Sequence, residues 1–304
     1  TEQKRWDALL ACSERCALQQ AWRYGEAVAA RGHGVRRLQL IEAGEPVALA
    51  QVILRRLPFG IDLGLLMRGP AWLCSMDDQA REGGAVASMR CCLSRSLLIW
   101  QPDDGAADDC RAGCRRVWTG PSTVLLNLDQ PLDTLRRQLK GKWRNMLTKA
   151  ETARLRLRDV SAGPRLDWLL EASDRQRRTV GYHGPSAEFL RAMQGGGAPK
   201  ARPALLALVA CQRHDEPLAG IVVARHGRSA TYYAGVTTPA GRRLNAHHLL
   251  LWSAIGRLRD EGCTTLDLGG VDTARGPGIA RFKLGLGGMP ITLAGSYLLP
   301  WRWR

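Results

Sequence analysis

One stretch near the end of the chain, Thr264–Gly288, has residue types and a spacing that could carry chemistry. It reads TTLDLGGVDTARGPGIARFKLGLGG, which predicts a short strand over 265–268, a break at two glycines and a Gly-Pro-Gly turn over 276–278. The run over 279–283 then ends in three further glycines. A strand that ends in an acidic residue and two glycines brings polar groups to a sheet edge, where functional residues tend to lie. A strand and a glycine-rich hairpin without chemistry is the alternative at this point.

A second candidate is a basic segment that follows Pro131. Its pattern predicts one long helix from Asp133 to about Leu155, with the apolar residues on one face. This helix holds three of the chain's six lysines, and its candidate phosphate contacts are Lys140, Lys142, Arg144 and Lys149. Such a strip can neutralise phosphates through counterion release. A solvated helix face without a partner is the alternative.

Two smaller clusters carry weaker signals. The segment over 174–184 is predicted to end a helix and enter a loop, where Arg178 and Tyr182 could both face a phosphate or an amide. The pair His247-His248 begins a predicted helix over 246–260, and such a pair is more often a packing or capping feature than a pair of ligands. The sequence has no G-x-S-x-G, H-E-x-x-H, Walker A or Rossmann glycine pattern.

The composition is that of a strongly basic globular protein. The chain has 304 residues, a net charge of +16 and a pI near 10.1. This balance favours a polyanionic partner such as RNA, DNA, anionic lipid or a phosphorylated substrate. The excess of arginine over lysine could equally reflect a GC-rich coding sequence.

The nine cysteines lack the spacing of a zinc site, so we expect no metal. An odd number of cysteines without a signal peptide is typical of free thiols in a reducing cytoplasm. No apolar run approaches the roughly 20 residues that span a bilayer. We therefore expect a cytoplasmic protein that could also work at the inner face of the membrane.

The order of predicted elements repeats along the chain. Each half contains a meander of three strands, over 35–67 and over 203–236, and the motifs Glu45-Pro46 and Glu216-Pro217 fall at equivalent points. A helix over 75–95 and a buried strand over 97–100 follow the first meander. The predicted fold class is α/β (α+β), with two tandem modules, each a mixed and mostly antiparallel sheet flanked by helices. The predicted modules are 1–121, completed by a C-terminal strand within 292–304, and 122–291, which carries the active site.

Duplicated meanders packed with helices suggest the acyltransferase fold of the GNAT superfamily. In that fold, a glycine-containing loop between a central strand and the next helix cradles the cofactor pyrophosphate. The equivalent segment here is 242–247, where Asn245 and His247 replace both glycines. Their side chains would obstruct the close backbone approach that glycine permits, which argues against acetyl-CoA.

Four passages further resemble the Fem family of non-ribosomal aminoacyltransferases, which are GNAT-related and built from two such modules. The resemblance covers about 120–290, and the amino-terminal module adds Arg68-Gly69-Pro70 and the order of its elements. The passages are 139–151 with the motif LKGKWRN, the Arg178…Tyr182 pair, Tyr232-Tyr233-Ala234-Gly235 with 245–252, and LDLGG over 266–270 followed by GIARFK over 278–283.

The family transfers an amino acid from aminoacyl-tRNA to an amine, typically on a peptidoglycan precursor of the cell wall. The resemblance implies that Lys283, beside Phe282, stabilises the developing oxyanion. It also implies that Arg178 and Tyr182 hold the acceptor and that Tyr232 or Tyr233 lines a peptide channel. Contact between the basic helix and tRNA phosphates is our own inference from charge.

Two departures from the family pattern bear on the acceptor. Many members carry a coiled-coil arm in the second module, and 150–200 leaves no room for one. Members that hold a nucleotide-sugar substrate have a basic residue shortly after the tryptophan that Trp22 matches. Glu26 falls near that place here, which places a nucleotide-linked muropeptide acceptor in doubt.

The leading hypothesis is direct attack of an acceptor amine on the aminoacyl ester, without a covalent enzyme intermediate. The amine must lose a proton, so a base is required, and Asp267 and Asp272 are the candidates. We expect no cofactor besides aminoacyl-tRNA, a muropeptide or small peptide as acceptor, no DNA, peripheral contact with a membrane, and a monomer or homodimer. The alternatives are an N-acyltransferase that uses acyl-CoA and an RNA-binding protein without catalysis.

Overall fold

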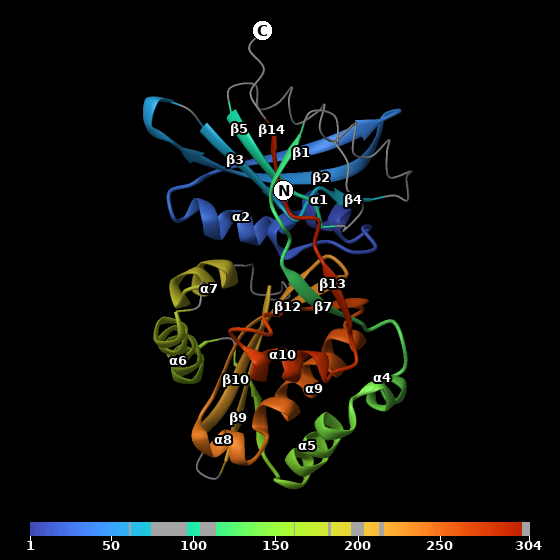
Figure 1. The fold of residues 1–304 in the computed structure, drawn as a ribbon, viewed down its shortest axis with the longest axis vertical. Helices are drawn as coiled ribbons and strands as arrows, with labels where there is room; N and C mark the ends of the chain where they lie inside the picture. Colours follow the sequence, from blue (N-terminus) through green and yellow to red (C-terminus); the bar gives the residue numbers. More distant parts are fainter. Residues whose placement is uncertain are drawn as a thin grey trace. The chain divides into compact units, whose positions relative to one another are not determined.

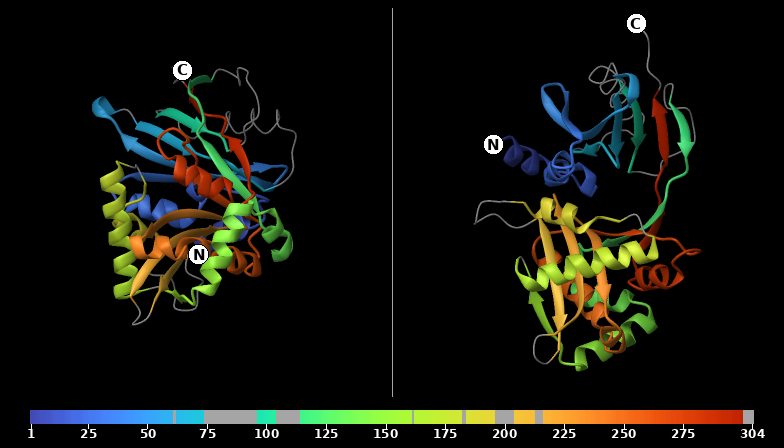
Figure 2. Two further views of the ribbon diagram at one scale, coloured as in Figure 1. Left: turned by 60° about the horizontal axis from the view of Figure 1, so that its bottom comes forward. Right: turned by 90° about the vertical axis from the view of Figure 1, so that its left-hand side faces the viewer.

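The chain divides into two units in a computed structural model, drawn in Figures 1 and 2. The first comprises Thr1–Ser122, His226–Arg228 and Ile291–Arg304, and the second comprises Thr123–Arg225 and Ser229–Pro290. The hairpin tip His226–Arg228 groups with the first unit. The structure describes residues 1–60, 62–73, 96–103, 114–160, 162–181, 184–195, 204–212 and 216–299.

The first unit is a sheet with helices from its amino-terminal segment. Its helices are α1 (Glu2–Leu10) and α2 (Trp22–Ala29), and its strands are β1 (Gly34–Glu42), β2 (Glu45–Arg56), β3 (Asp62–Met67), β4 (Ala71–Trp72), β5 (Ser96–Gln101), β6 (Arg115–Trp118) and β14 (Ser296–Leu299). The strand order is β1-β2-β3-β5-β14-β6, with β4 also paired to β2. Trp100, Leu66 and Val52 are buried in its core.

The second unit has a sheet of the order β13-β7-β12-β11-β10-β9-β8. Its strands are β7 (Ser122–Asn127), β8 (Arg156–Asp159), β9 (Leu205–Cys211), β10 (Pro217–His226), β11 (Ser229–Thr237), β12 (Thr265–Gly270) and β13 (Met289–Thr292). Its helices are α4 (Leu132–Gln138), α5 (Gly141–Thr152), α6 (Pro164–Val180), α7 (Ala187–Gln194), α8 (Pro239–Arg243), α9 (Ala246–Asp260) and α10 (Pro277–Leu284).

The two sheets repeat one pattern of strands. In the first unit β2 pairs antiparallel with β1 and β3, and β3 pairs parallel with β5. In the second unit β10 pairs antiparallel with β9, and β11 pairs parallel with β12. The predicted fold class, two tandem mixed α/β modules, is confirmed. Within the described part of 150–200 the chain forms α6 and α7, without a coiled-coil arm.

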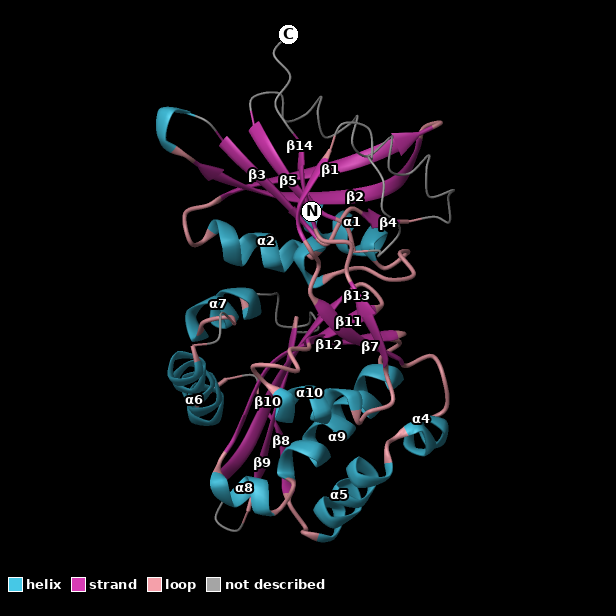
Figure 3. Cartoon of the chain, viewed as in Figure 1, coloured by secondary structure: helices cyan, strands magenta, loops and turns pink. Residues whose placement is uncertain are grey.

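Helices cover both faces of the second sheet, with α6 and α7 on one side and α5, α9 and α10 on the other (Figure 3). The apolar faces of α5 and α9 and the inner residues of the strands form one buried cluster, which includes Trp143, Leu147, Leu250 and Ile255. Because successive side chains of a strand point to opposite faces, Tyr232 and Tyr233 of β11 face different helical layers.

Two sequence predictions need correction. The long helix over 133–155 is two helices, since Leu139 and Lys140 have extended backbones and the Lys140 amide donates to the Gly285 carbonyl at 2.9 Å. The segment after the Gly-Pro-Gly turn is a helix, α10, and not part of a loop or hairpin. The helix predicted over 75–95 lies outside the described residues.

Candidate active site

Lys283 lies in the last turn of α10, with its side chain directed back toward the end of β12. The helix begins with Pro277 at its first position, where a missing N–H costs nothing, and ends at Leu284, with Gly285 as its C-cap. The residue is only 8 % exposed, and its Nζ donates to the Gly270 carbonyl at 2.8 Å. A lysine is rarely this buried without a specific reason, which marks it as a functional candidate.

Burial lowers the pKa of Lys283 to about 8, while the negative charge of Asp267 acts in the opposite direction. Desolvation disfavours the charged form, so this ammonium group has fewer stabilising partners than an exposed lysine has. At neutral pH it is still mostly protonated. A desolvated cation of this kind interacts strongly with a negative charge that develops beside it.

A β-bulge at the end of β12 shapes the backbone around Lys283. The pairing with β7 shifts between Asp267 and Gly270, and Gly269 has a φ of 73° that favours glycine. Asp267 is buried, and its Oδ1 accepts from Thr123 Oγ1 at 2.5 Å and from the Gly269 amide at 2.8 Å. These bonds give Asp267 a structural part in holding the bulge next to Lys283.

Asp272 lies in the loop between β12 and α10. Its Oδ1 accepts from the backbone amides of Ala274 and Arg275 at 2.9 and 2.8 Å, and the Arg275 amide is the main cause of its lowered pKa. A carboxylate with these bonds shapes a turn and is a poor proton acceptor. Its role as the base therefore stays a prediction without geometric support.

Tyr232 lies beside Lys283 and is held by a histidine. Its ring centroid is 6.0 Å from Lys283 Nζ, and its hydroxyl is 2.9 Å from His247 Nε2. The other ring nitrogen of His247, Nδ1, is 2.8 Å from Thr237 Oγ1. Burial, and then the charge of His248, lower the pKa of His247 to about 4, so the ring is neutral at pH 7.

Phe282, the residue before Lys283, packs at the centre of an aromatic group. Its ring centroid lies 5.3 Å from that of His247, 5.0 Å from that of His248 and 5.8 Å from that of Trp143. Among the described residues, Trp143 Nε1 and His248 Nδ1 are buried without a hydrogen-bond partner. The motif residues Trp143, His247 and Phe282 thus meet from α5, α9 and α10.

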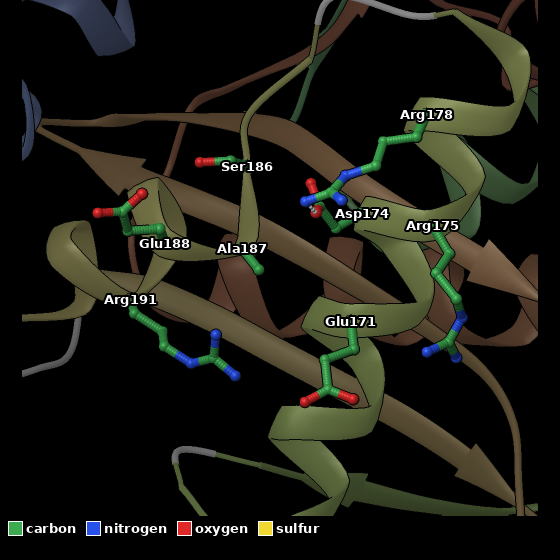
Figure 4. A pocket seen from close by; sticks show the side chains of 8 residues that line it. All are labelled: Glu171, Asp174, Arg175, Arg178, Ser186, Ala187, Glu188 and Arg191. Atoms are coloured by element: carbon green, nitrogen blue, oxygen red, sulfur yellow. Dashed lines mark ion pairs between the residues drawn. The ribbon is translucent and has the colours of Figure 1, made fainter.

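Arg178 lies in a separate groove between α6 and α7, on the opposite face of the sheet (Figure 4). The groove has a volume of about 450 Å³, and three acidic and three basic side chains line it: Glu171, Asp174, Glu188, Arg175, Arg178 and Arg191. The Arg178 guanidinium pairs with Asp174 at 2.8 Å, and Arg177 binds the same carboxylate and chiefly lowers its pKa. Tyr233 packs edge-on against Phe189 of α7, in this helical layer. Tyr182 lies outside the described residues.

The basic side chains of α5 and of Lys140, the residue before it, divide into two kinds. Lys140, Lys142 and Lys149 are exposed, and none of the ion pairs in the described part of the chain involves them. Arg144 instead donates through Nη2 to the carbonyls of Arg137 and Leu139, both at 2.8 Å, and so binds the end of α4 to the start of α5. The structure therefore gives Arg144 a structural part that the sequence did not indicate.

The sequence reading missed the part that His247 takes in this site. The His247-His248 pair was expected to be a packing or capping feature, and both rings do pack on Phe282. The additional bonds to Tyr232 and Thr237 depend on β11 and α9 lying side by side, which a local pattern cannot reveal. Within the described residues no group of three side chains has the arrangement of a metal site, and no helix is long and apolar enough to cross a membrane.

The comparisons with known proteins begin with the second unit. Residues 134–284 match the family described as "Acetyltransferase (GNAT) domain". No curated protein sequence matches the chain.

The whole chain is similar in structure to FemX, with a TM-score of 0.82 at 14 % identity, covering 98 % of this chain and 95 % of FemX. It is also similar to L-PGS from Bacillus licheniformis, with a TM-score of 0.56 at 13 % identity over 99 % of this chain and 92 % of that one. The C-terminal domain of a putative lysylphosphatidylglycerol synthetase from Agrobacterium fabrum gives 0.56 at 14 % identity, over 98 % and 90 %. The predicted resemblance is thus confirmed as a Fem-like fold, and the GNAT family match lies in its second unit.

Proposed function

We propose that this protein transfers an aminoacyl group from aminoacyl-tRNA to an acceptor amine and forms an amide bond. The observation that carries the proposal is the buried Lys283 of α10, whose Nζ donates to the Gly270 carbonyl of β12 and lies 6.0 Å from the Tyr232 ring centroid. A desolvated cation with a fixed position is suited to a reaction in which negative charge develops on a carbonyl oxygen. The fold shared with FemX supports the same class of reaction.

In the proposed mechanism the neutral acceptor amine attacks the carbonyl carbon of the aminoacyl ester. The C–N bond forms, and the carbonyl oxygen becomes an oxyanion next to Lys283 Nζ. One of the three N–H groups of Lys283 donates to the Gly270 carbonyl, and in this mechanism the other two donate to the oxyanion. The C–O bond to the ribose then breaks, and the proton that the amine loses goes to the leaving ribose oxygen.

Two features favour aminoacyl-tRNA over acyl-CoA as the donor. In the loop between β11 and α9, Asn245 has a left-handed backbone with φ 53°, and the ring of His247 fills the space between β11 and α10. Both positions carry a side chain where the GNAT pattern has glycine, and a side chain there obstructs the close backbone approach that a pyrophosphate needs. The exposed lysines of α5 offer a surface that suits RNA phosphates.

The acceptor we propose is a peptide amine, on a peptidoglycan precursor or a small peptide. The groove between α6 and α7 carries equal numbers of acidic and basic side chains. Such a surface suits a ligand with both an amine and a carboxylate better than a simple anion. In this proposal Arg178 binds the acceptor away from the reacting amine, and Tyr233 lines the same helical layer.

Mass spectrometry of the products formed from total charged tRNA and candidate acceptors tests the proposal. We expect an aminoacylated acceptor with the intact protein and a loss of at least a hundredfold in rate with Lys283→Ala. The family match to an acetyltransferase domain supports one competing function, N-acylation from acyl-CoA. Product formation from acetyl-CoA, with none from charged tRNA, would replace our proposal with that one.

A further inference from the structure

The two hydrogen bonds of His247 connect it to the wall of the proposed site. We infer that His247 is a positioning residue, which holds the ring of Tyr232 next to Lys283 and thereby keeps water away from the lysine. The reaction that this arrangement serves rests on the proposed function. The arrangement itself involves only side chains of the second unit, and it can be tested without any substrate.

The first support is the two-point attachment of the His247 ring. Tyr232 and Thr237 belong to one strand, β11, and His247 lies in the first turn of α9. The hydroxyl of Tyr232 is 2.9 Å from Nε2, and Thr237 Oγ1 is 2.8 Å from Nδ1. With both nitrogens engaged the imidazole cannot rotate, so it fixes the direction of the Tyr232 hydroxyl and with it the plane of the phenol ring.

The second support is the charge state of His247. Burial lowers its pKa to about 4, so the ring is neutral at any pH at which the protein would work. A neutral imidazole donates from one nitrogen and accepts at the other, which matches a hydroxyl partner on each side. It also adds no positive charge near Lys283, whose own charge is already poorly solvated.

The third support is the close packing around the Tyr232–His247 pair. A methyl group at Gly235 would lie 2.1 Å from the Tyr232 hydroxyl oxygen and 2.6 Å from His247 Cε1, so only glycine leaves room for the hydrogen bond. Phe282 closes the other side, edge-on to His247 with ring centroids 5.3 Å apart. The backbone of β11 and the side chains of α10 thus keep both rings in one position.

The distance between the Tyr232 ring and Lys283 Nζ indicates how the ring changes the surroundings of the lysine. The Tyr232 ring centroid is 6.0 Å from Nζ, which is the outer limit of a useful cation–π contact, so the ring acts mainly by occupying space that water would fill. Desolvation is the main cause of the lowered pKa of Lys283. A Tyr232 ring that is free to move would admit water, and the pKa of Lys283 would rise toward its ordinary value of 10.5.

NMR titration of protein labelled at its lysine side chains tests the inference in the absence of substrate. The chain has only six lysines, so the Lys283 signal can be assigned by its loss in Lys283→Arg. We expect Lys283 to titrate near pH 8 in the unmodified protein. In His247→Phe and in Tyr232→Phe, each of which keeps a ring but removes the hydrogen bond, we expect the pKa to rise by about one unit.

Two further variants make the result specific. If His247 acts only through the Tyr232 hydroxyl, the double variant shifts the Lys283 titration no further than either single variant does. His248→Phe is the matched control, since His248 packs on the same Phe282 but has no bond to Tyr232. It should leave the titration unchanged.

The possible outcomes separate the inference from the proposed function. An unchanged Lys283 titration in His247→Phe, or additive shifts in the double variant, would overturn the positioning role. The expected titration shifts in a protein that transfers no aminoacyl group would support the positioning role and reject the proposed reaction. If both are right, kcat falls about tenfold in His247→Phe while the KM of the acceptor is unchanged.

Discussion

Replacing Lys283 with methionine should make the protein more stable and much less active. Methionine has nearly the same length and fills the same space without a charge. The difference between a pKa of 10.5 and one of about 8 means that the folded protein disfavours the Lys283 cation by about 3 kcal/mol. The hydrogen bond to the Gly270 carbonyl, worth about 1 kcal/mol, is lost as well. The net gain in the free energy of unfolding at pH 7 is therefore about 2 kcal/mol.

The pH dependence of stability gives this prediction a direction that can be checked. Because the folded pKa of Lys283 is lowered, the unfolded chain binds more protons between about pH 8 and pH 10.5. The cost of burying the Lys283 cation is therefore fully present below pH 8. As the pH rises from about 8 to 10.5 this cost disappears, and the free energy of unfolding increases. Lys283→Met lacks that rise, so the difference between the two proteins should shrink as the pH approaches 10.5.

Urea unfolding at several pH values measures the stability, and aminoacyl transfer measures the activity. We expect the methionine variant to lose between about a hundredfold and a thousandfold in kcat, as is typical when a group that stabilises an oxyanion is removed. Lys283→Arg, which keeps a charge of larger size, separates loss of charge from loss of fit. A methionine variant that is less stable than the parent at pH 7, or that keeps its turnover, would refute the reasoning.

Three further predictions follow from the second unit. Changing Lys142 and Lys149 to glutamate should weaken tRNA binding and reduce the slope of log K against log salt concentration by about two. Filter binding at several salt concentrations measures this slope. An equal loss of tRNA affinity in Lys4→Glu would show that only net charge matters. Arg144→Ala should destabilise the protein by about 1–3 kcal/mol without a specific effect on tRNA affinity, because its guanidinium bonds backbone carbonyls. Gly285→Ala should cost about 1–3 kcal/mol in a thermal or urea melt, since the new methyl would lie 2.7 Å from Trp143 Cδ1; an unchanged melting curve would contradict this packing.

The elements that the sequence predicts well are those with a strong local pattern. The helix Ala246–Asp260 and the strands of both meanders have apolar periodicity and clear turn residues, and the structure has them where the patterns place them. The Gly-Pro-Gly pattern over 276–278 predicts a turn, whereas the structure begins a helix at Pro277. A proline at the first position and a glycine just past the end are helix signals, and they are the ones that decided its structure.

In the candidate site, too, the sequence indicates some functional residues and leaves the roles of others undetermined. Lys283, Phe282 and Tyr232 could be picked out because they belong to motifs, and the structure brings these three together. The roles of Asp267 and Asp272 cannot be predicted from the sequence, because the hydrogen-bond partners of their carboxylates depend on a β-bulge and a turn. Arg144 illustrates the same limit, since a cation in a basic run can bind carbonyl groups of its own chain.

The two sheets differ in how far their parallel strands stay paired. In the first unit the parallel strands β3 and β5 stay paired over six residues, from Asp62↔Ser96 to Met67↔Gln101. In the second unit the equivalent strands β11 and β12 pair only from Ser229↔Thr265 to Thr231↔Asp267, and Tyr232 is the next residue of β11. Where the pairing stops, backbone groups need other partners, and Lys283 Nζ supplies one to the Gly270 carbonyl. The buried cation of the candidate site therefore lies where the parallel pairing of β11 and β12 stops, next to Tyr232 and its partner His247.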